Sequence, residues 1–289
     1  MRRITARLQP RDYVLAHLLD DHRVLTAPQI HTTLFTSPRT CRNRLDALRH
    51  LGFIDKFLPT RHGDRLPAHW VPGLLSARYA ALARGERPPT VKAVRDRQDA
   101  TAASPHLHHT TGTNQFFVDL IVHSRTHAGC RLTRWWPDHR IAAALGRRVH
   151  PDGHGVWRHH GTEVGFLLEY DTGTETLGTL VGKLAAYRRL RADDGPHWPI
   201  LIYLPTTTRE TNLHHKLATT TLTGITVATA ARDRVNGAGP AGPVWRLAGN
   251  GRARLHLADL PAHAGRPGPY HPGPPTPDQD PLYLLDGPG

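Results

Sequence analysis

The stretch from Val149 to Tyr187 constrains the fold more than any other, because it places two strand patterns and a helix pattern in close succession. The second strand pattern, Val164 to Asp171, contains the unbroken apolar run 166–168, as expected for a strand buried on both faces. The first strand pattern carries Asp152 and pairs with the second if residues 158–163 form the hairpin loop. We therefore expect a sheet built around this hairpin.

Acidic side chains gather at one end of this hairpin. The loop pairs Trp157 with Val164, and counting outward puts Asp152 opposite Glu169. Asp171 shares the face of Glu169, because residues i and i+2 of a strand point the same way. Three carboxylates so close would repel one another, and a hard divalent cation relieves that repulsion. The pattern predicts a Mg²⁺ site with Asp152, Glu169 and Asp171 as ligands.

A helix follows the acidic strand end. Thr174 is the expected N-cap, and an apolar stripe at helical spacing ends at Tyr187. Lys183 lies on the flank of that stripe and could project toward the acids. In a phosphodiester-hydrolysing site the metal would activate water and Lys183 would stabilise developing charge. The alternative is an inactive site in which Asp152 and Asp171 are only turn residues.

The arrangement of Pro-Asp on one strand, Glu-x-Asp on the next and Lys on the following helix resembles the PD-(D/E)XK nuclease-like fold. That fold ordinarily has a lysine where this chain has Asp171, and the resemblance implies that Lys183 takes its part. More closely, LLEYDTGTE followed by KLAAY is similar to the replication-relaxation family of plasmid and mobile-element proteins, over roughly residues 10 to 230. This resemblance implies a winged helix before a nuclease-like domain, and work in plasmid replication or conjugative transfer.

The first 97 residues carry much of the positive charge, with eighteen Lys and Arg against eight Asp and Glu. Such an excess favours a polyanionic partner, DNA or RNA. Three helical patterns precede two extended runs joined by a turn-prone segment, an order that predicts a winged helix-turn-helix. These patterns lie at residues 11–21, 27–34, 38–51, 53–58 and 68–71.

The third of these helices is the one expected to enter the major groove of duplex DNA, where Arg and Asn read base edges. Its predicted contact residues are Arg39, Thr40, Arg42 and Asn43, and those of the wing are Arg61 and Arg65. The alternative is a winged helix that contacts another protein.

The predicted fold class is α/β in an α+β arrangement, with a winged helix followed by a nuclease-like αβββαβ core. A polar stretch separates the two, and a segment with 8 Gly and 10 Pro in residues 236–281 is expected to be disordered. The predicted divisions are a winged-helix domain at 1–87, a linker at 88–104, a nuclease-like domain at 105–233 and a disordered tail at 234–289.

Several classes are disfavoured. No apolar run approaches membrane-spanning length and the first residues lack a signal-peptide core, so a cytoplasmic protein without a membrane partner is expected. Cys41 and Cys130 stand far apart, which disfavours a disulfide framework or a cysteine zinc site. The histidine clusters fit no standard ligand spacing, and no GxxxxGK[ST] motif indicates an ATPase.

We therefore expect a DNA-binding protein of plasmid replication or conjugative transfer, whose winged helix anchors duplex DNA and whose nuclease-like domain acts on it or holds it. Its expected partners are double-stranded DNA and replication or transfer proteins. Two alternatives stay open: an active Mg²⁺-dependent endonuclease or nickase, and a non-catalytic transcription or replication regulator that works through protein contacts.

Overall fold

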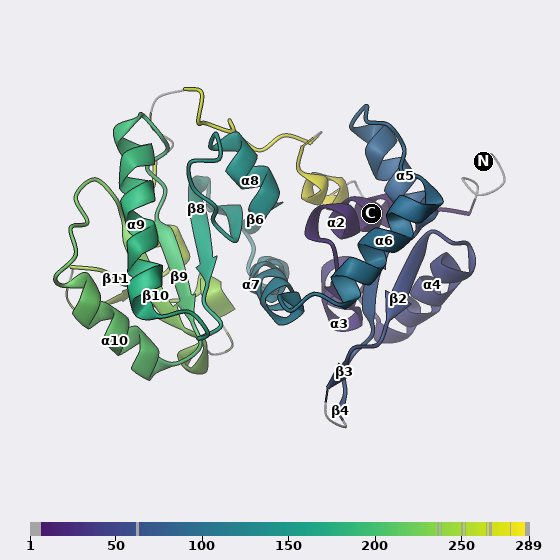
Figure 1. The fold of residues 1–289 in the computed structure, drawn as a ribbon, viewed down its shortest axis with the longest axis horizontal. Helices are drawn as coiled ribbons and strands as arrows, with labels where there is room; N and C mark the ends of the chain where they lie inside the picture. Colours follow the sequence, from purple (N-terminus) through teal and green to yellow (C-terminus); the bar gives the residue numbers. More distant parts are fainter. Residues whose placement is uncertain are drawn as a thin grey trace. The chain divides into compact units, whose positions relative to one another are not determined.

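The computed structural model describes residues 7–61, 64–235, 237, 239–249, 251, 253–263, 265, 268–277 and 279–286. The chain forms two compact units (Figure 1), one from residues up to Val118 together with those from Pro277 onward, and one from Asp119 to Thr276. Both units combine helices with β-sheet, which confirms the predicted mixed α/β class.

In the first unit, three helices precede two extended strands, as the sequence predicts, and a two-residue strand between the first and second helices adds a third strand to their antiparallel sheet. Thr26 and Ser37 cap the second and third of these helices by accepting hydrogen bonds from backbone N–H groups. The sheet has the strand order β1-β5-β2. The elements are α2 (Pro10–His22), β1 (Leu25–Thr26), α3 (Ala27–Leu34), α4 (Pro38–His50), β2 (Ile54–Phe57), β3 (Thr60–Arg61), β4 (Asp64–Arg65), β5 (His69–Pro72) and α5 (Leu74–Ala83).

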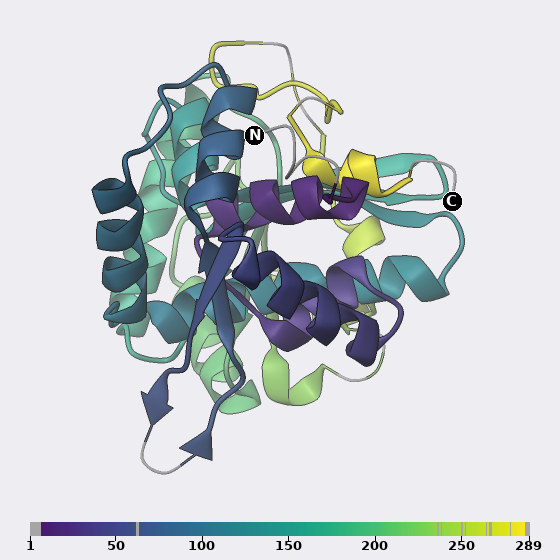
Figure 2. The ribbon, with the colours of Figure 1, turned by 90° about the vertical axis from the view of Figure 1, so that its right-hand side faces the viewer.

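The turn-prone segment between β2 and β5 extends the sheet into an arm. Strands β3 and β4 pair at the end of this arm (Figure 2), with Thr60 opposite Arg65 and Arg61 opposite Asp64. Residues 62–63 lie outside the described residues, and for Arg61 and Arg65 the structure describes only the backbone. The backbone therefore has the arm that a wing requires.

The predicted linker at 88–104 is wrong, because most of it is the helix α6 (Val91–Ala102). The Thr90 hydroxyl caps α6, Val94 is buried, and Gln98 Nε2 donates a 2.7 Å hydrogen bond to the carbonyl of Pro72 in β5. Only one of the twelve residues of α6 is buried, so its sequence lacks the apolar period that marks a helix. The segment is part of the first unit.

The first unit also extends beyond the predicted boundary at 104. Helix α7 (Leu107–Thr126) lies within the predicted nuclease-like domain, but its first part belongs to the first unit. Buried Asn114 donates a 2.8 Å hydrogen bond to the carbonyl of Val24. Asn114 thus ties α7 to the chain just before β1.

The second unit is built on a seven-stranded sheet with the order β12-β11-β10-β9-β8-β7-β6. Strands β8, β9 and β10 are parallel, and the other neighbours are antiparallel. This contains the predicted αβββαβ order, with the additional helix α8 inside it. The elements are β6 (Cys130–Pro137), α8 (Asp138–Ala144), β7 (Gly153–His159), β8 (Thr162–Tyr170), α9 (Leu177–Ala192), β9 (Ile200–Leu204), α10 (Thr207–Leu217), β10 (Val227–Ala231), β11 (Trp245–Leu247) and β12 (Arg254–Leu255).

Three helices, α8, α9 and α10, share one apolar core with one face of this sheet (Figure 1). Leu180 and Leu184 of α9 and Leu213 of α10 pack with Leu167 of β8 and Ile202 of β9. Because Leu167 and Glu169 are two residues apart on β8, Glu169 points to the same helix-covered face. The core thus fixes the helices that surround the acidic strand end.

The prediction of a disordered tail at 234–289 is wrong for its described residues. Strands β11 and β12 extend the sheet, and Trp245 is fully buried, with Nε1 donating a 2.8 Å hydrogen bond to the carbonyl of Pro240. The 3₁₀ segment Pro281–Asp286 packs on α2 in the first unit. Gly and Pro keep the regular elements short in this segment. Apolar side chains such as Leu257 are nevertheless buried in the interior.

Candidate functional site

The β7–β8 hairpin has the predicted register with a tighter turn. Trp157 lies opposite Val164, as expected, but pairing continues to His159 opposite Thr162. The loop is therefore not residues 158–163, because the chain reverses at His160 and Gly161. Both of these residues have positive φ, 46° and 89°, as two-residue hairpin turns require.

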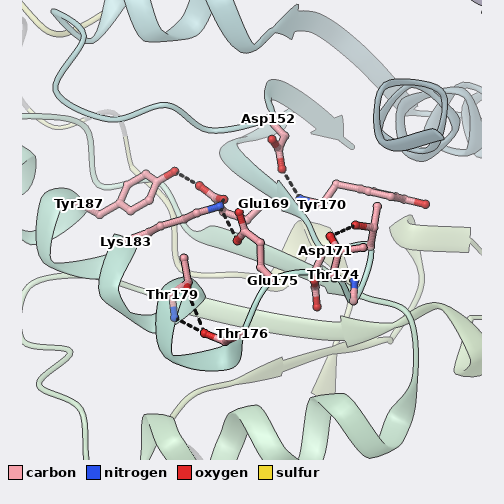
Figure 3. A network of polar contacts seen from close by, with 12 residues as sticks. Asp152, Glu169, Tyr170, Asp171, Thr174, Glu175, Thr176, Thr179, Lys183 and Tyr187 are labelled. Atoms are coloured by element: carbon pink, nitrogen blue, oxygen red, sulfur yellow. Dashed lines mark hydrogen bonds and ion pairs between the residues drawn. The ribbon is translucent and has the colours of Figure 1, made fainter. Parts of the chain in front are cut away.

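Asp152 lies one residue before β7 rather than within it. Gly153 is opposite Leu168, and the Asp152 N–H donates a 2.8 Å hydrogen bond to the Leu168 carbonyl, so Asp152 stands opposite Glu169 as predicted. The Asp152 carboxylate accepts a 2.7 Å hydrogen bond from the backbone N–H of Tyr170 (Figure 3). Asp152 therefore has both a turn role and a place beside Glu169.

Glu169 lies at the centre of a buried polar network (Figure 3). Lys183 Nζ is 3.2 Å from one carboxylate oxygen, and the fully buried Tyr187 hydroxyl donates to the other. Lys183 Nζ also lies 3.1 Å from a carboxylate oxygen of Glu175. The structure thus brings Lys183 to Glu169, as the sequence predicts.

This environment shifts the acid–base properties of the network. Burial, with the nearby Asp152 carboxylate, raises the pKa of Glu169 to about 7, although Lys183 and Tyr187 oppose the shift. Burial lowers the pKa of Lys183, but Glu169 and Glu175 together raise it above the ordinary lysine value. A carboxyl group that titrates near neutral pH can gain or lose a proton under physiological conditions.

Asp171 does not join this network, so the predicted three-acid cluster is wrong. The Asp171 carboxylate pairs with Arg209 of α10, whose Nη2 lies 3.1 Å from Oδ1 and whose Nε contacts Oδ2. The Gly173 N–H also donates to it, at 2.8 Å. Strand β8 ends at Tyr170, so strand alternation does not determine the surroundings of Asp171, and α10 supplies a cation.

The start of α9 also differs from the prediction. The N-cap is Thr176, whose hydroxyl accepts a 3.1 Å hydrogen bond from the Thr179 N–H, and not Thr174. The later start leaves Glu175 outside the helix, where its carboxylate contacts Lys183.

Sequence reasoning missed the arginines that hold the strand end. Arg209 also donates a 2.6 Å hydrogen bond to the Glu175 carbonyl, and Arg232 donates to the backbone carbonyls of Asp171 and Tyr203. A signal was present for Arg209, because it lies in the first turn of α10, where the helix dipole disfavours a cation. An arginine there indicates a nearby carboxylate.

In the first unit, the four predicted contact residues of α4 are exposed, whereas the arginines later in α4 form ion pairs. Within the described residues neither Arg39 nor Arg42 forms an ion pair. By contrast, Arg44 pairs with buried Asp12, and Arg49 pairs with Asp55. The exposed residues are Arg39, Thr40, Arg42 and Asn43.

The acidic residues at the strand end fit a Mg²⁺ ion only in part. No group of three or more His, Cys, Asp or Glu side chains in the described part of the chain is arranged to hold a metal ion. Mg²⁺ commonly uses one or two carboxylates and completes its shell with water and phosphate oxygens. Asp152 and Glu169, on neighbouring strand positions, fit that smaller set, whereas Asp171, held by Arg209, does not.

Several histidine and tryptophan side chains of the second unit pack in its interior. His154 is fully buried and stacks on Trp198, and burial lowers its pKa to about 3. Trp135 and Trp136 are also buried. These aromatic side chains therefore contribute to the core and not to an exposed stacking surface.

Together these features define a mixed α/β protein with an exposed cationic helix in one unit and, in the other, a buried glutamate that contacts a buried tyrosine and a partly exposed lysine. The family model described as Replication-relaxation matches residues 17–203. The chain belongs to the replication-relaxation family, which suggests a role in the replication or transfer of plasmids and other mobile elements. No curated protein and no solved structure matches the chain. Among the described residues, no helix has the length and apolar character needed to cross a membrane.

Proposed function

We propose that this protein binds duplex DNA through its first unit and acts in plasmid replication or conjugative transfer, with α4 as the recognition helix of a winged helix-turn-helix. The observation that carries this proposal is the pair of exposed arginines, Arg39 and Arg42, which form no ion pair within the described residues. Unpaired cations on an exposed helix face are available to phosphates and to guanine edges.

The surroundings of α4 support this use. Asn43 and Thr40 are exposed on the same half of the helix and can hydrogen-bond to bases or phosphates. The Arg44–Asp12 pair fixes α4 on α2, so the exposed residues are presented from a rigid support. Arg61 and Arg65, on the arm formed by β3 and β4, are proposed to contact phosphates.

The test compares DNA binding by the full chain and by the double variant Arg39→Ala/Arg42→Ala across a salt series. Arg49→Ala is the matched control, because Arg49 lies on the same helix but already pairs with Asp55. Loss of two phosphate contacts should reduce the slope of log affinity against log salt by about 2. If the cations read bases, affinity for the preferred sequence should fall by about tenfold or more.

The control should keep both its affinity and its salt slope nearly unchanged. Equal binding by the double variant and the wild type, at every salt concentration, would show that α4 is not the DNA contact. In that case the alternative of a regulator that acts through protein contacts gains support.

The buried network favours a second function, Mg²⁺-dependent cleavage of DNA by an endonuclease or nickase. Asp152 and Glu169 would hold the metal, which would polarise the phosphate and activate water. Lys183 would stabilise negative charge developing on the phosphate. The observation that favours this candidate is the buried Glu169, whose pKa of about 7 is typical of functional carboxylates.

Supercoiled plasmid incubated with Mg²⁺ or Mn²⁺ tests this second function. Cleavage that is lost in both Glu169→Gln and Lys183→Met, and kept in Glu163→Gln, would establish it. Glu163 is a suitable control because its carboxylate pairs with exposed Arg158, on the hairpin, away from Glu169. Binding without cleavage would instead mean that the second unit holds DNA rather than cuts it.

A further inference from the structure

A small cavity in the second unit is lined by basic and apolar side chains with no carboxylate among them. Its volume is about 70 Å³, well above the roughly 10–15 Å³ that a single water molecule requires. It lies beside the end of α9 and the first residues of β9 and β10. Asp171 and the starts of α9 and α10 lie at the other end of the parallel strands. The polar and charged residues around it include Arg191, His197, Thr226 and His263.

Arg191, which lines this cavity, has a buried N–H group without a hydrogen-bond acceptor among the described residues. Its Nε atom is buried and has no hydrogen-bond partner among the described residues. Its Nη1 atom makes only a long contact of 3.4 Å with the carbonyl of Gly195. A buried guanidinium N–H without an acceptor is unfavourable, and an oxyanion in the cavity would supply one.

Three histidines gather beside Arg191. His197 and His263 form a backbone bridge, and their ring centroids are 4.1 Å apart. His271 belongs to the same group, because a side chain at Gly265 would meet both His197 and His271. Burial, together with the positive charge of Arg191, His263 and His271, lowers the pKa of His197. Burial and these neighbours therefore favour the neutral form of His197.

Two backbone carbonyls at the end of α9 contact this group, since Gly195 O lies 3.4 Å from Arg191 Nη1 and Asp194 O lies 3.1 Å from His271 Nε2, but neither satisfies Arg191 Nε. Asp194 has a left-handed backbone conformation, with φ of 59°, and the Gly195 N–H donates a 2.9 Å hydrogen bond to the Leu190 carbonyl. Asp193 pairs with Arg148, so its carboxylate is engaged away from the cavity. No carboxylate lines the cavity, and Arg191 forms no ion pair within the described residues.

We propose that this cavity is a binding site for a phosphoryl group, held by Arg191, His197 and His263. The group would be inorganic phosphate or the terminal phosphate of a nucleic-acid strand. A phosphate accepts hydrogen bonds on every oxygen and carries negative charge, so it satisfies Arg191 Nε and offsets the positive charge of Arg191 beside His197. Binding should strengthen as the pH falls, because protonated histidines add positive charge. The site is separate from α4 and does not depend on the DNA-binding proposal.

The full chain is titrated with inorganic phosphate at about pH 6 and at about pH 8. Chloride salt keeps the ionic strength constant at about 0.1 M throughout the titration. Phosphorus NMR reports the bound ligand, and histidine ring signals report the cluster. We expect tighter binding at the lower pH, and a higher pKa of His197 when phosphate is present. Arg191→Gln should weaken binding by about tenfold or more, because a charge-assisted hydrogen bond is lost.

Arg188→Gln is the matched control, since Arg188 is exposed on the same helix and should leave phosphate binding unchanged. His263→Gln provides a second test if Arg191→Gln does not fold. Two strands of identical sequence, one terminally phosphorylated and one with a terminal hydroxyl, distinguish the sources. Preference for the phosphorylated strand over free phosphate assigns the site to a strand end, and the reverse assigns it to free phosphate. Equal phosphate binding by wild type and Arg191→Gln, or no change in the His197 signal, would overturn the proposal.

Discussion

The exposed arginines at the start of α4 and the buried carboxylates of the second unit differ in whether they form ion pairs. Arg39 and Arg42 are exposed, and in the described part of the chain neither is paired. In the second unit, buried carboxylates are each matched to a cation from a different element. These pairs are Asp171 with Arg209, Glu210 with Arg254, and Glu169 with Lys183.

This difference separates charges that are available to a partner from charges that hold the fold. An exposed arginine exchanges water and counterions for phosphate with little loss of protein structure. A buried pair has already lost its hydration, so removing one member leaves an uncompensated charge in the interior. Substitutions in the two regions should therefore change different quantities, binding in the first and stability in the second.

The largest effect is expected from ending the chain after Val235, which removes both Trp245 and Arg254. Loss of a buried tryptophan alone costs about 3–5 kcal/mol, and buried Glu210 also loses its cation. Because a domain is stable by only about 5–15 kcal/mol, most of the second unit should unfold. Thermal unfolding followed by circular dichroism measures this.

A chain ending after Thr276 is the control for that truncation, because it keeps all strands of the second unit. If the chain ending after Val235 melted at the wild-type temperature, the packed segment that includes β11 and β12 would contribute little to stability.

Arg209→Ala should have the next largest effect. It leaves the Asp171 carboxylate, whose side chain is 3% exposed, without its partner, and we expect a loss of about 3–5 kcal/mol in the free energy of unfolding. Arg158→Ala breaks an exposed pair with Glu163 and should cost about 1 kcal/mol or less. Chemical denaturation of both variants gives the comparison, and equal losses would remove the distinction between buried and exposed pairs.

Glu169→Gln should change how stability depends on pH. The carboxyl has an ordinary pKa of 4.5 when unfolded and about 7 when folded, so the folded state binds more protons between these values. Stability should therefore fall as the pH rises through this window, by up to about 1.4 kcal/mol per pH unit. Glu169→Gln should flatten that part of the curve, whereas Glu163→Gln should not. An unchanged slope would mean that Glu169 titrates normally.

The smallest change in stability is expected for Arg39→Ala/Arg42→Ala. Exposed residues without ion pairs can be truncated within about 0.5 kcal/mol. Denaturation curves should overlay the wild type even where DNA affinity has fallen. A clear loss of stability would show that these arginines support the fold, which would weaken their assignment to DNA.

The sequence predicted most of the regular elements where a strong period was present. The α4 helix, the β7–β8 register and the approach of Lys183 to Glu169 all followed from alternation, helical spacing and capping residues. These are local properties, because each depends on residues that are near in sequence or paired through one tight turn.

The errors arose where distant segments determine the structure. Asp171 pairs with Arg209, which is 38 residues away; the place of Arg209 in the first turn of α10 indicates a nearby carboxylate, but no local pattern identifies which one. Helix α6 buries only Val94, so its fold depends on contacts with α5 and β5 and not on its own period. Trp245 lies in the sheet although Gly and Pro flank its strand. The short strand β11 pairs with β10 and with β12, and Trp245 is buried there.

The first unit draws on two separated parts of the chain, with the 3₁₀ segment Pro281–Asp286 packed on α2. During synthesis, α2 leaves the ribosome long before this segment, and at about 5–20 residues per second the delay lasts many seconds. The second unit is therefore synthesised, and can fold, before the segment Pro281–Asp286 is available to pack on α2. We expect the first unit of a newly synthesised chain to pass through a state in which the α2 surface that contacts Pro281–Asp286 is uncovered and available to chaperones.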